Sequence, residues 1–149
     1  MEKLSIDSIQ IGDWVYRIDF NTPVPSKIIG IEVVNYDKME YVVDVLNKNG
    51  YNVQLYLNEI KPIPITPEIL EKNGWEQSNI DVVDDDVQYG CAYGSFYVTW
   101  WRKVKLLSCY FEDNSAGLHY EMISEMPIKY VHQLQNALRL CGIDKEIEL

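Results

Sequence analysis

Hydrophobic and polar positions alternate in short runs over the first 66 residues of the chain. The β-prone runs cover residues 14–18, 27–34, 41–46, 53–57 and 60–65, and turn-forming residues separate them. The Asn49-Gly50 pair between two of these runs is typical of a β-hairpin. Five short strands in such a stretch predict a small closed barrel, because closure removes exposed sheet edges. The ends of this region resemble the ends of SH3-like barrels.

A short helix is predicted over residues 66–74. Thr66 is a typical N-cap residue, Pro67 suits the first helical position, and Gly74 suits the residue that ends a helix. Trp75 follows directly, and we expect its ring to fold back on the helix and stabilise it by burial.

The β pattern returns after this helix. Strands are predicted at residues 82–83, 89–93, 96–101, 104–111 and 118–123, with turns between them that are rich in Asp, Asn, Ser and Gly. Strands of this length favour an antiparallel sheet that has one face buried and one face exposed.

The last strongly patterned stretch, residues 126–142, predicts an amphipathic helix. Pro127 is expected in its first turn and Gly142 at its end. Its apolar stripe, expected to pack on the second sheet, consists of Ile128, Val131, Leu134, Leu138 and Cys141.

The predicted fold class is therefore mainly β with two helices (α+β). Residues 1–66 form an SH3-like β-barrel, and residues 67–149 form an α+β half with a short helix, antiparallel strands and a C-terminal helix. We found no repeat or flexible linker, so the two halves are expected to pack tightly together.

The chain is acidic, with a net charge of −10. A general role in binding duplex nucleic acid requires many Lys and Arg contacts to phosphates, so the composition argues against such a role. The three cysteines have no paired spacing, the N-terminus lacks an apolar signal core, and no apolar run could span a membrane. We therefore expect a cytoplasmic protein.

No metal, cofactor or catalytic motif is recognisable. The cysteines and the two histidines lack ligand spacing, and Asp84, Asp85 and Asp86 are consecutive rather than alternating as in a calcium loop. Cys109 and His119 could meet across neighbouring strands, but no acid, base and nucleophile set is evident. We therefore predict a protein that is not an enzyme and has no cofactor or metal. An enzyme of unknown reaction stays open as an alternative, after the two binding functions described below.

One segment combines aromatic and basic side chains in this acidic chain. Alternate residues of a strand share a face, so Tyr97 and Trp101 point to one side and Trp100 to the other, with basic residues following. Such a cluster could stack a base and neutralise a phosphate, or it could consist of core aromatics beside solvated cations. The candidate ligand-binding residues are Tyr97, Trp100, Trp101, Arg102, Lys103 and Lys105.

The C-terminal helix offers a second candidate. His132, Gln135, Asn136 and Arg139 share one face, and these side chains could contact the polar groups of a ligand or partner. The alternative is a solvated face.

Two motifs resemble a family of small uncharacterised proteins that phages and prophages of gut bacteria encode. The motifs are YVHQLQN at residues 130–136 and IKPIPITPEIL at residues 60–70, the latter followed by Gly74-Trp75. The resemblance covers most of the chain and implies a bacterial host, but no activity and no catalytic residues. Ala137 and Arg139 depart from the pattern, because aromatic residues are expected there.

These observations lead to two functional hypotheses of different kinds. The first is a non-enzymatic phage accessory protein that captures a small anionic ligand, such as a nucleotide signal of host defence. The second is an inhibitor or adaptor that binds a host or phage protein. No membrane partner is expected, and association with further copies of the chain stays open.

Overall fold

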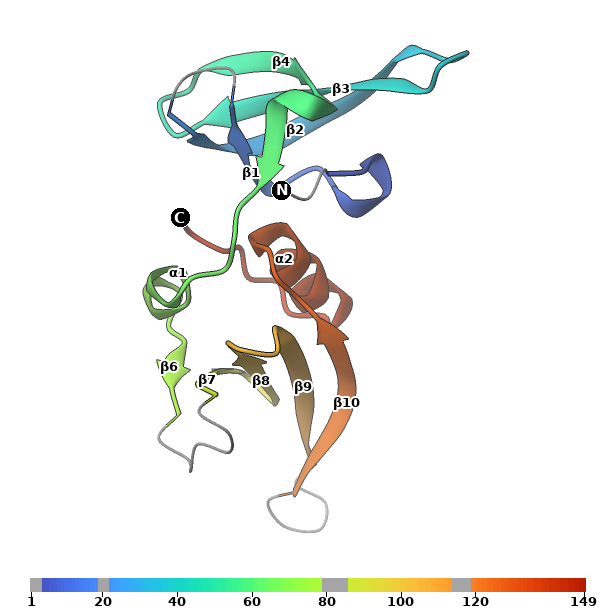
Figure 1. The fold of residues 1–149 in the computed structure, drawn as a ribbon. Coiled ribbons are helices and arrows are strands. Elements are labelled where there is room, and N and C mark those ends of the chain that lie inside the picture. Colours follow the sequence, from blue (N-terminus) through green and yellow to red (C-terminus); the bar gives the residue numbers. More distant parts are fainter. Residues whose placement is uncertain (1–3, 19–21, 79–85, 114–118) are drawn as a thin grey trace. The chain divides into compact units, whose positions relative to one another are not determined.

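The computed structural model describes residues 4–18, 22–78, 86–113 and 119–149 (Figure 1). It is mainly β, with two antiparallel five-stranded sheets and two α-helices, which confirms the predicted α+β class. The chain forms two compact units. The first comprises Met1–Pro64 and Tyr130–Gln135, and the second comprises Ile65–Lys129 and Asn136–Leu149.

The first unit is built around a sheet in the order β4-β3-β2-β1-β5. Its elements are the 3₁₀ turn η1 (Ile6–Ser8), β1 (Trp14–Arg17), β2 (Val24–Asn35), β3 (Glu40–Asn47), β4 (Asn52–Tyr56), the 3₁₀ turn η2 (Leu57–Glu59) and β5 (Ile60–Pro62). Gly50 has a positive φ of 81° in the turn between β3 and β4, as the Asn49-Gly50 pair predicts. The core of this unit consists of Ile9, Val15, Ile28, Val43, Val45, Leu55 and Ile60.

The SH3-like barrel is not confirmed. Strands β4 and β5 are at opposite ends of the sheet order, and the described residues show no pairing between them. The run predicted at residues 60–65 is strand only as far as Pro62, and the 3₁₀ turn at Leu57–Glu59 separates it from β4. The described residues therefore show a five-stranded antiparallel sheet, and its closure into a barrel is not shown.

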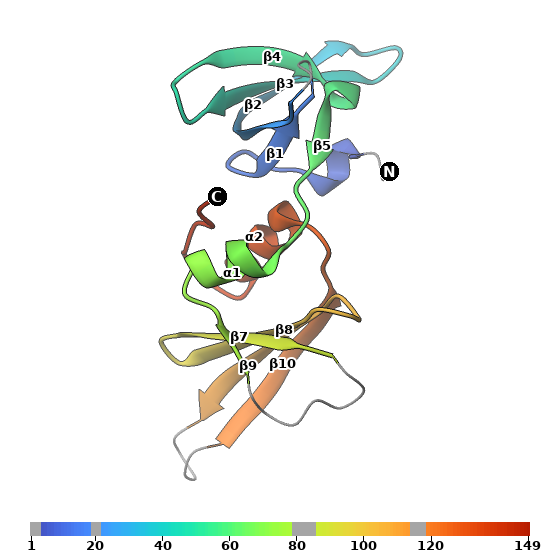
Figure 2. The same ribbon diagram turned by 60° about the vertical axis from the view of Figure 1, so that its left-hand side comes forward.

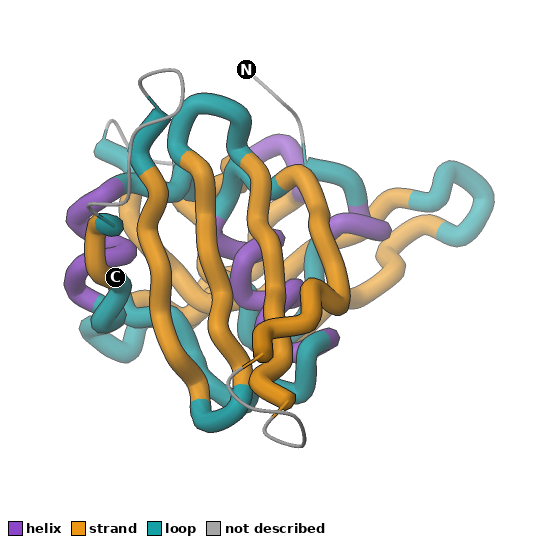
Figure 3. The backbone as a smooth tube through the Cα atoms, turned by 90° about the horizontal axis from the view of Figure 1, so that it is seen from below, coloured by secondary structure: helices purple, strands orange, loops and turns teal. Residues whose placement is uncertain are grey.

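The second unit has a sheet in the order β10-β9-β8-β7-β6. Its elements are α1 (Pro67–Lys72), β6 (Glu76–Gln77), β7 (Gln88–Tyr93), β8 (Phe96–Trp101), β9 (Leu106–Asp113), β10 (His119–Pro127) and the C-terminal part of α2 (Val131–Leu140). Helix α1 and the C-terminal part of α2 lie over one face of this sheet (Figure 2), and the strands are open to view from the other side (Figure 3). The run predicted at residues 82–83 lies outside the described residues.

The strand predicted at residues 104–111 begins two residues later than expected. Residues 102–105 form a turn, and Lys105 has a positive φ of 56°. The carboxylate of the buried Asp86 accepts a hydrogen bond from the Lys103 amide at 2.6 Å and another from the Val104 amide at 3.3 Å. This carboxylate therefore fixes the turn between β8 and β9.

The short helix α1 has the predicted ends. The Thr66 hydroxyl accepts a hydrogen bond from the Ile69 amide at 3.4 Å, and Gly74 has a positive φ of 81°. Trp75 is almost fully buried, and its amide donates to the Leu70 carbonyl. The helix is thus closed by its own sequence and held by the Trp75 ring.

The C-terminal helix was predicted to begin too early. Pro127 is the last residue of β10, where it pairs with Leu106, and α2 begins only at Val131. Proline is tolerated there because β10 is an edge strand. The Gln133 side chain accepts a hydrogen bond from the Tyr130 amide at 3.2 Å, as in one half of a capping box. No helix in the described ranges is long and apolar enough to cross a membrane.

Candidate functional site

Trp100 is a core residue of the second unit. Its side chain is fully buried, and its indole N–H donates a hydrogen bond to the Ile128 carbonyl at 3.0 Å. The ring also contacts Tyr89 on β7, with 6.4 Å between the ring centres. A buried indole with its only donor satisfied is typical of a structural tryptophan.

The basic residues that follow are arranged around the turn between β8 and β9. Arg102 and Lys103 are exposed. The Lys105 ammonium lies 4.9 Å from the centre of the Trp100 ring, which is within the range of a cation–π contact. These cations are thus near the turn, and Lys105 contacts the buried aromatic ring.

Tyr97 and Trp101 lie on the sheet face opposite to Trp100. Their strand register pairs Tyr97 with Tyr110 and Trp101 with Leu106, and both side chains are half-buried. Built onto Gly90, a Cβ atom would lie 2.9 Å from the Tyr97 ring, so Tyr97 packs closely over the backbone of β7. The six predicted residues are therefore distributed over two sheet faces and a turn.

The predicted polar face of α2 is largely covered. His132 and Gln135 are almost fully buried, while Asn136 and Arg139 are half-buried. The Arg139 guanidinium donates a hydrogen bond to the Asn136 side-chain oxygen at 3.1 Å. The His132 ring stacks on Tyr130, with centres 5.9 Å apart and planes inclined by 8°. Burial lowers the pKa of His132 to about 4, so the imidazole is neutral at physiological pH.

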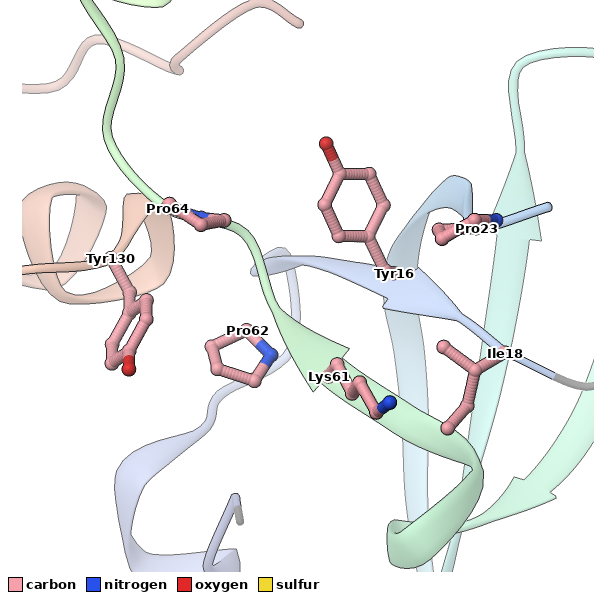
Figure 4. A pocket seen from close by; sticks show the side chains of 7 residues that line it. All are labelled: Tyr16, Ile18, Pro23, Lys61, Pro62, Pro64 and Tyr130. Atoms are coloured by element: carbon pink, nitrogen blue, oxygen red, sulfur yellow. The ribbon is translucent and has the colours of Figure 1, made fainter. Parts of the chain in front are cut away.

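A pocket in the first unit has the geometry of a ligand site. Its volume is about 330 Å³. Figure 4 shows the seven side chains that line it. We call it the proline pocket; its lining residues are Tyr16, Ile18, Pro23, Lys61, Pro62, Pro64 and Tyr130. None of the ten residues predicted from the sequence is among these seven.

Three segments that are distant in the sequence form this pocket. On the β1 and β5 pair, Tyr16 is directly opposite Lys61, so these two side chains share a sheet face. After β5, Pro64 forms a β-bridge with Tyr130, and the Val131 amide donates to the Ile63 carbonyl at 2.9 Å. These backbone bonds hold the start of α2 beside the end of β5.

The chemistry of the proline pocket favours a planar apolar group with a negative charge. Its three prolines have a fixed φ and little side-chain entropy to lose, so this part of the wall is rigid before a ligand binds. The two tyrosine rings provide flat apolar surface, and both are half-buried. Lys61 is the only one of the seven lining residues that is charged at neutral pH.

The cysteines do not form a metal or nucleophilic site in the described part of the chain. No group of three or more His, Cys, Asp or Glu residues lies in a metal-binding arrangement among the described residues. The register pairs Cys109 with Ser124 and places His119 opposite Asp113 instead, at the far end of β10. Burial and the neighbouring Cys141 thiol raise the pKa of Cys109 to about 12.

We expect the Cys109 thiol to be the least reactive of the three in the folded protein. At about pH 8 a pKa near 12 leaves roughly one thiol in ten thousand ionised, and the thiolate is the reactive form. Cys91 is half-exposed and should react first with a thiol reagent such as iodoacetamide. Peptide mapping by mass spectrometry of native and denatured samples measures the order. Labelling of native Cys109 as fast as Cys91 would contradict this expectation.

Comparisons with known proteins add no relative to this description. The resemblance to small phage and prophage proteins therefore stays a prediction from the motifs at residues 60–70 and 130–136. No protein-family model, curated protein or solved structure matches the chain.

Proposed function

We propose that this chain is a non-enzymatic binding protein whose proline pocket captures a small anionic ligand with a planar apolar group. The observation that carries the proposal is a rigid apolar wall beside a single ammonium group. The volume of about 330 Å³ is at the lower end of the range of ligand pockets, roughly 300–1,000 Å³. A pocket of this size suits a compact ligand.

One ammonium group favours a ligand with one negative charge. A polyphosphate needs several cationic or amide donors, and Lys61 is the only cation among the seven described lining residues. A cyclic nucleoside monophosphate belongs to the proposed class, because its phosphodiester carries one negative charge next to a planar base, whereas a phosphate monoester carries nearly two. The proposal therefore includes a singly charged nucleotide that signals host defence and that the protein would bind in the cytoplasm of a bacterial host.

An SH3-like barrel is part of the same proposal for the first unit. The order β4-β3-β2-β1-β5 and the 3₁₀ turn before β5 support it. In this arrangement the pairing of the first and last strands, β1 and β5, creates the wall that carries Tyr16 and Lys61.

Replacing Lys61 by methionine is expected to weaken the binding of aromatic anions at least about tenfold, which corresponds to the loss of roughly 1.4 kcal/mol of binding free energy. Methionine keeps an apolar stem and removes the charge. Calorimetry with 1-anilinonaphthalene-8-sulfonate, aromatic carboxylates and cyclic nucleoside monophosphates, each of which carries one negative charge, measures the effect. Neutral amides of the same carboxylates should bind the wild type and the variant with similar affinity.

Two further variants separate the pocket from general charge effects. Lys38→Met removes an exposed lysine of the same unit that does not line the pocket, and it should leave affinity unchanged. Tyr130→Leu should weaken anions and neutral amides alike, because it removes an aromatic wall. The proposal fails if the wild type binds no member of the panel, or if Lys61→Met and Lys38→Met have the same effect.

A further inference from the structure

The hairpin formed by β2 and β3 extends beyond the core of the first unit (Figures 1 and 3). Its inner part carries the buried Ile28, Val43 and Val45. Its outer part, residues 33–41, is called the hairpin arm here, and it exposes apolar side chains. Tyr36 is 79% exposed and Met39 is 59% exposed. Exposed tyrosine and methionine on one projecting element are typical of an interaction surface rather than of a free hairpin.

The turn of the arm has a defined conformation. The Asn35 side-chain oxygen accepts a hydrogen bond from the Lys38 amide at 3.2 Å. Met39 has a positive φ of 50°, a conformation that costs a residue other than glycine about 1 kcal/mol. A turn held in this way presents Tyr36 and Met39 with little conformational entropy left to lose on binding.

A groove of about 430 Å³ lies at the foot of the arm. Its lining residues are Met39, Glu40, Tyr41, Tyr56, Leu57 and Asn58. The Glu59 carboxylate accepts a hydrogen bond from the Tyr56 amide at 2.8 Å, which fixes the far wall. A partner that added a β-strand to this edge would need the Tyr56 amide as a hydrogen-bond donor, but that amide is already bonded to Glu59. The groove therefore favours recognition of a partner through its side chains.

The charge of this surface defines the partner. The hairpin arm contains two acidic residues (Asp37 and Glu40) and one basic residue (Lys38), a net charge of −1, and Glu32 adds a third carboxylate directly before the arm. The whole chain carries −10, so a second copy would be repelled. A basic partner would be attracted to the acidic rim and could place apolar side chains against Tyr36, Met39 and the groove.

We propose that the hairpin arm and its groove dock a cationic amphipathic helix of a partner protein. Apolar residues at helical spacing enter the groove and cover the arm, and lysine or arginine residues pair with the acidic rim. This surface uses none of the seven residues of the proline pocket. The docking proposal can therefore be tested independently of the proposed ligand binding.

Three peptides of matched length test the proposal by fluorescence anisotropy. The first is a leucine and lysine peptide with helical spacing, the second has the same composition in strict alternation, and the third replaces each lysine of the first by glutamate. We expect the first peptide to bind, with an affinity that falls as salt rises. The second and third should bind at least about tenfold more weakly.

Variants on the arm locate the binding. Tyr36→Ser combined with Met39→Ser should weaken the first peptide at least about tenfold, since truncation removes exposed anchors and leaves the core intact. Tyr51→Ser is the matched control, because Tyr51 is 69% exposed in the turn between β3 and β4 of the same unit, and affinity should not change. Thermal unfolding of both variants should match that of the wild type.

Three results overturn the proposal. The first is equal binding of the two lysine peptides, which would show attraction by charge alone. The second is equal affinity of the arm variant and the wild type. The third is self-association of the wild type in sedimentation that the arm variant loses, which would identify a second copy as the occupant.

Discussion

Replacing Asn73 by alanine is expected to lower the free energy of unfolding of the second unit by about 3 kcal/mol. The Asn73 amide nitrogen donates hydrogen bonds to the Ile69 and Glu148 carbonyls, both at 2.8 Å. Its oxygen accepts one from the Glu148 amide, also at 2.8 Å. Asn73 is buried, and alanine would remove all three of these bonds. The Ile69 carbonyl would keep the backbone amide of residue 73 as a donor, at 3.3 Å, whereas the amide and the carbonyl of Glu148 would both lose their protein partner at a part-buried position.

The loss should release the C-terminal segment in particular. Ile143 and Ile147 are buried, and the Lys72 ammonium donates a hydrogen bond to the Leu149 carbonyl at 2.7 Å. The Asn73 side chain joins this segment to the end of α1, because it both donates a hydrogen bond to the Glu148 backbone and accepts one from it. Urea denaturation measures the stability, and hydrogen exchange of the Glu148 amide reports the local release.

Two variants make the expectation specific to the Asn73 bonds. Asn73→Asp keeps an acceptor for the Glu148 amide but turns a carboxylate toward two carbonyls, so it should destabilise at least as much as alanine. Asn58→Ala removes an exposed asparagine and should change stability by less than about 0.5 kcal/mol. Similar stability of Asn73→Ala and Asn58→Ala would show that the three bonds contribute nothing measurable.

The burial of the C-terminal segment could not be predicted from the pattern of hydrophobic and polar residues. Residues after Gly142 have no helical or strand periodicity, and no element was predicted there. Ile143 and Ile147 are nevertheless buried because Asn73 and Lys72 bind the backbone of this segment from a distant part of the chain. The spacing of two isoleucines in a polar stretch was the only available signal.

Helix boundaries were predictable where they depend on local bonds. The ends of α1 follow from Thr66, Pro67 and Gly74, all within one or two turns. The predicted start of α2 was wrong because Pro127 belongs to β10, where it pairs with Leu106 of β9. A proline suits both a first helical turn and an edge strand, and only the sheet distinguishes them.

The candidate site was less predictable than the fold. Alternation along β8 correctly separated Trp100 from Tyr97 and Trp101, but both sets are aromatic, so the pattern could not identify the buried face. The proline pocket unites Tyr16, Lys61 and Tyr130, and no local pattern connects such distant positions. The polar face of α2 was predicted to contact a ligand or partner or, alternatively, to be solvated, yet His132 and Gln135 are buried.

The stability of the protein is expected to fall as the pH decreases from about 6.5 to about 4, and His132 is the reason. Burial lowers the pKa of this imidazole to about 4 from its usual 6.5. Between these values the unfolded chain binds a proton at His132 and the folded protein does not, so protonation favours unfolding. The loss grows to about 3 kcal/mol near pH 4 and then levels off.

The comparison of His132→Phe with the parent protein isolates this effect. Phenylalanine keeps a ring that can stack on Tyr130 and cannot be protonated, so the variant should lose the stability change between about pH 6.5 and pH 5. His119→Gln is introduced into both proteins, so that His132 is the only imidazole that differs. Carboxylates titrate mainly below this window and affect both proteins alike. Urea unfolding across the pH series measures the difference in free energy of unfolding between the parent protein and the variant. This difference must increase with pH in favour of the parent protein.

A difference that stays constant between pH 5 and pH 6.5 would mean that His132 is protonated as readily in the folded protein as in the unfolded chain. In that case the Nδ1 atom, which has no hydrogen-bond partner among the described residues, would have to be accessible to solvent.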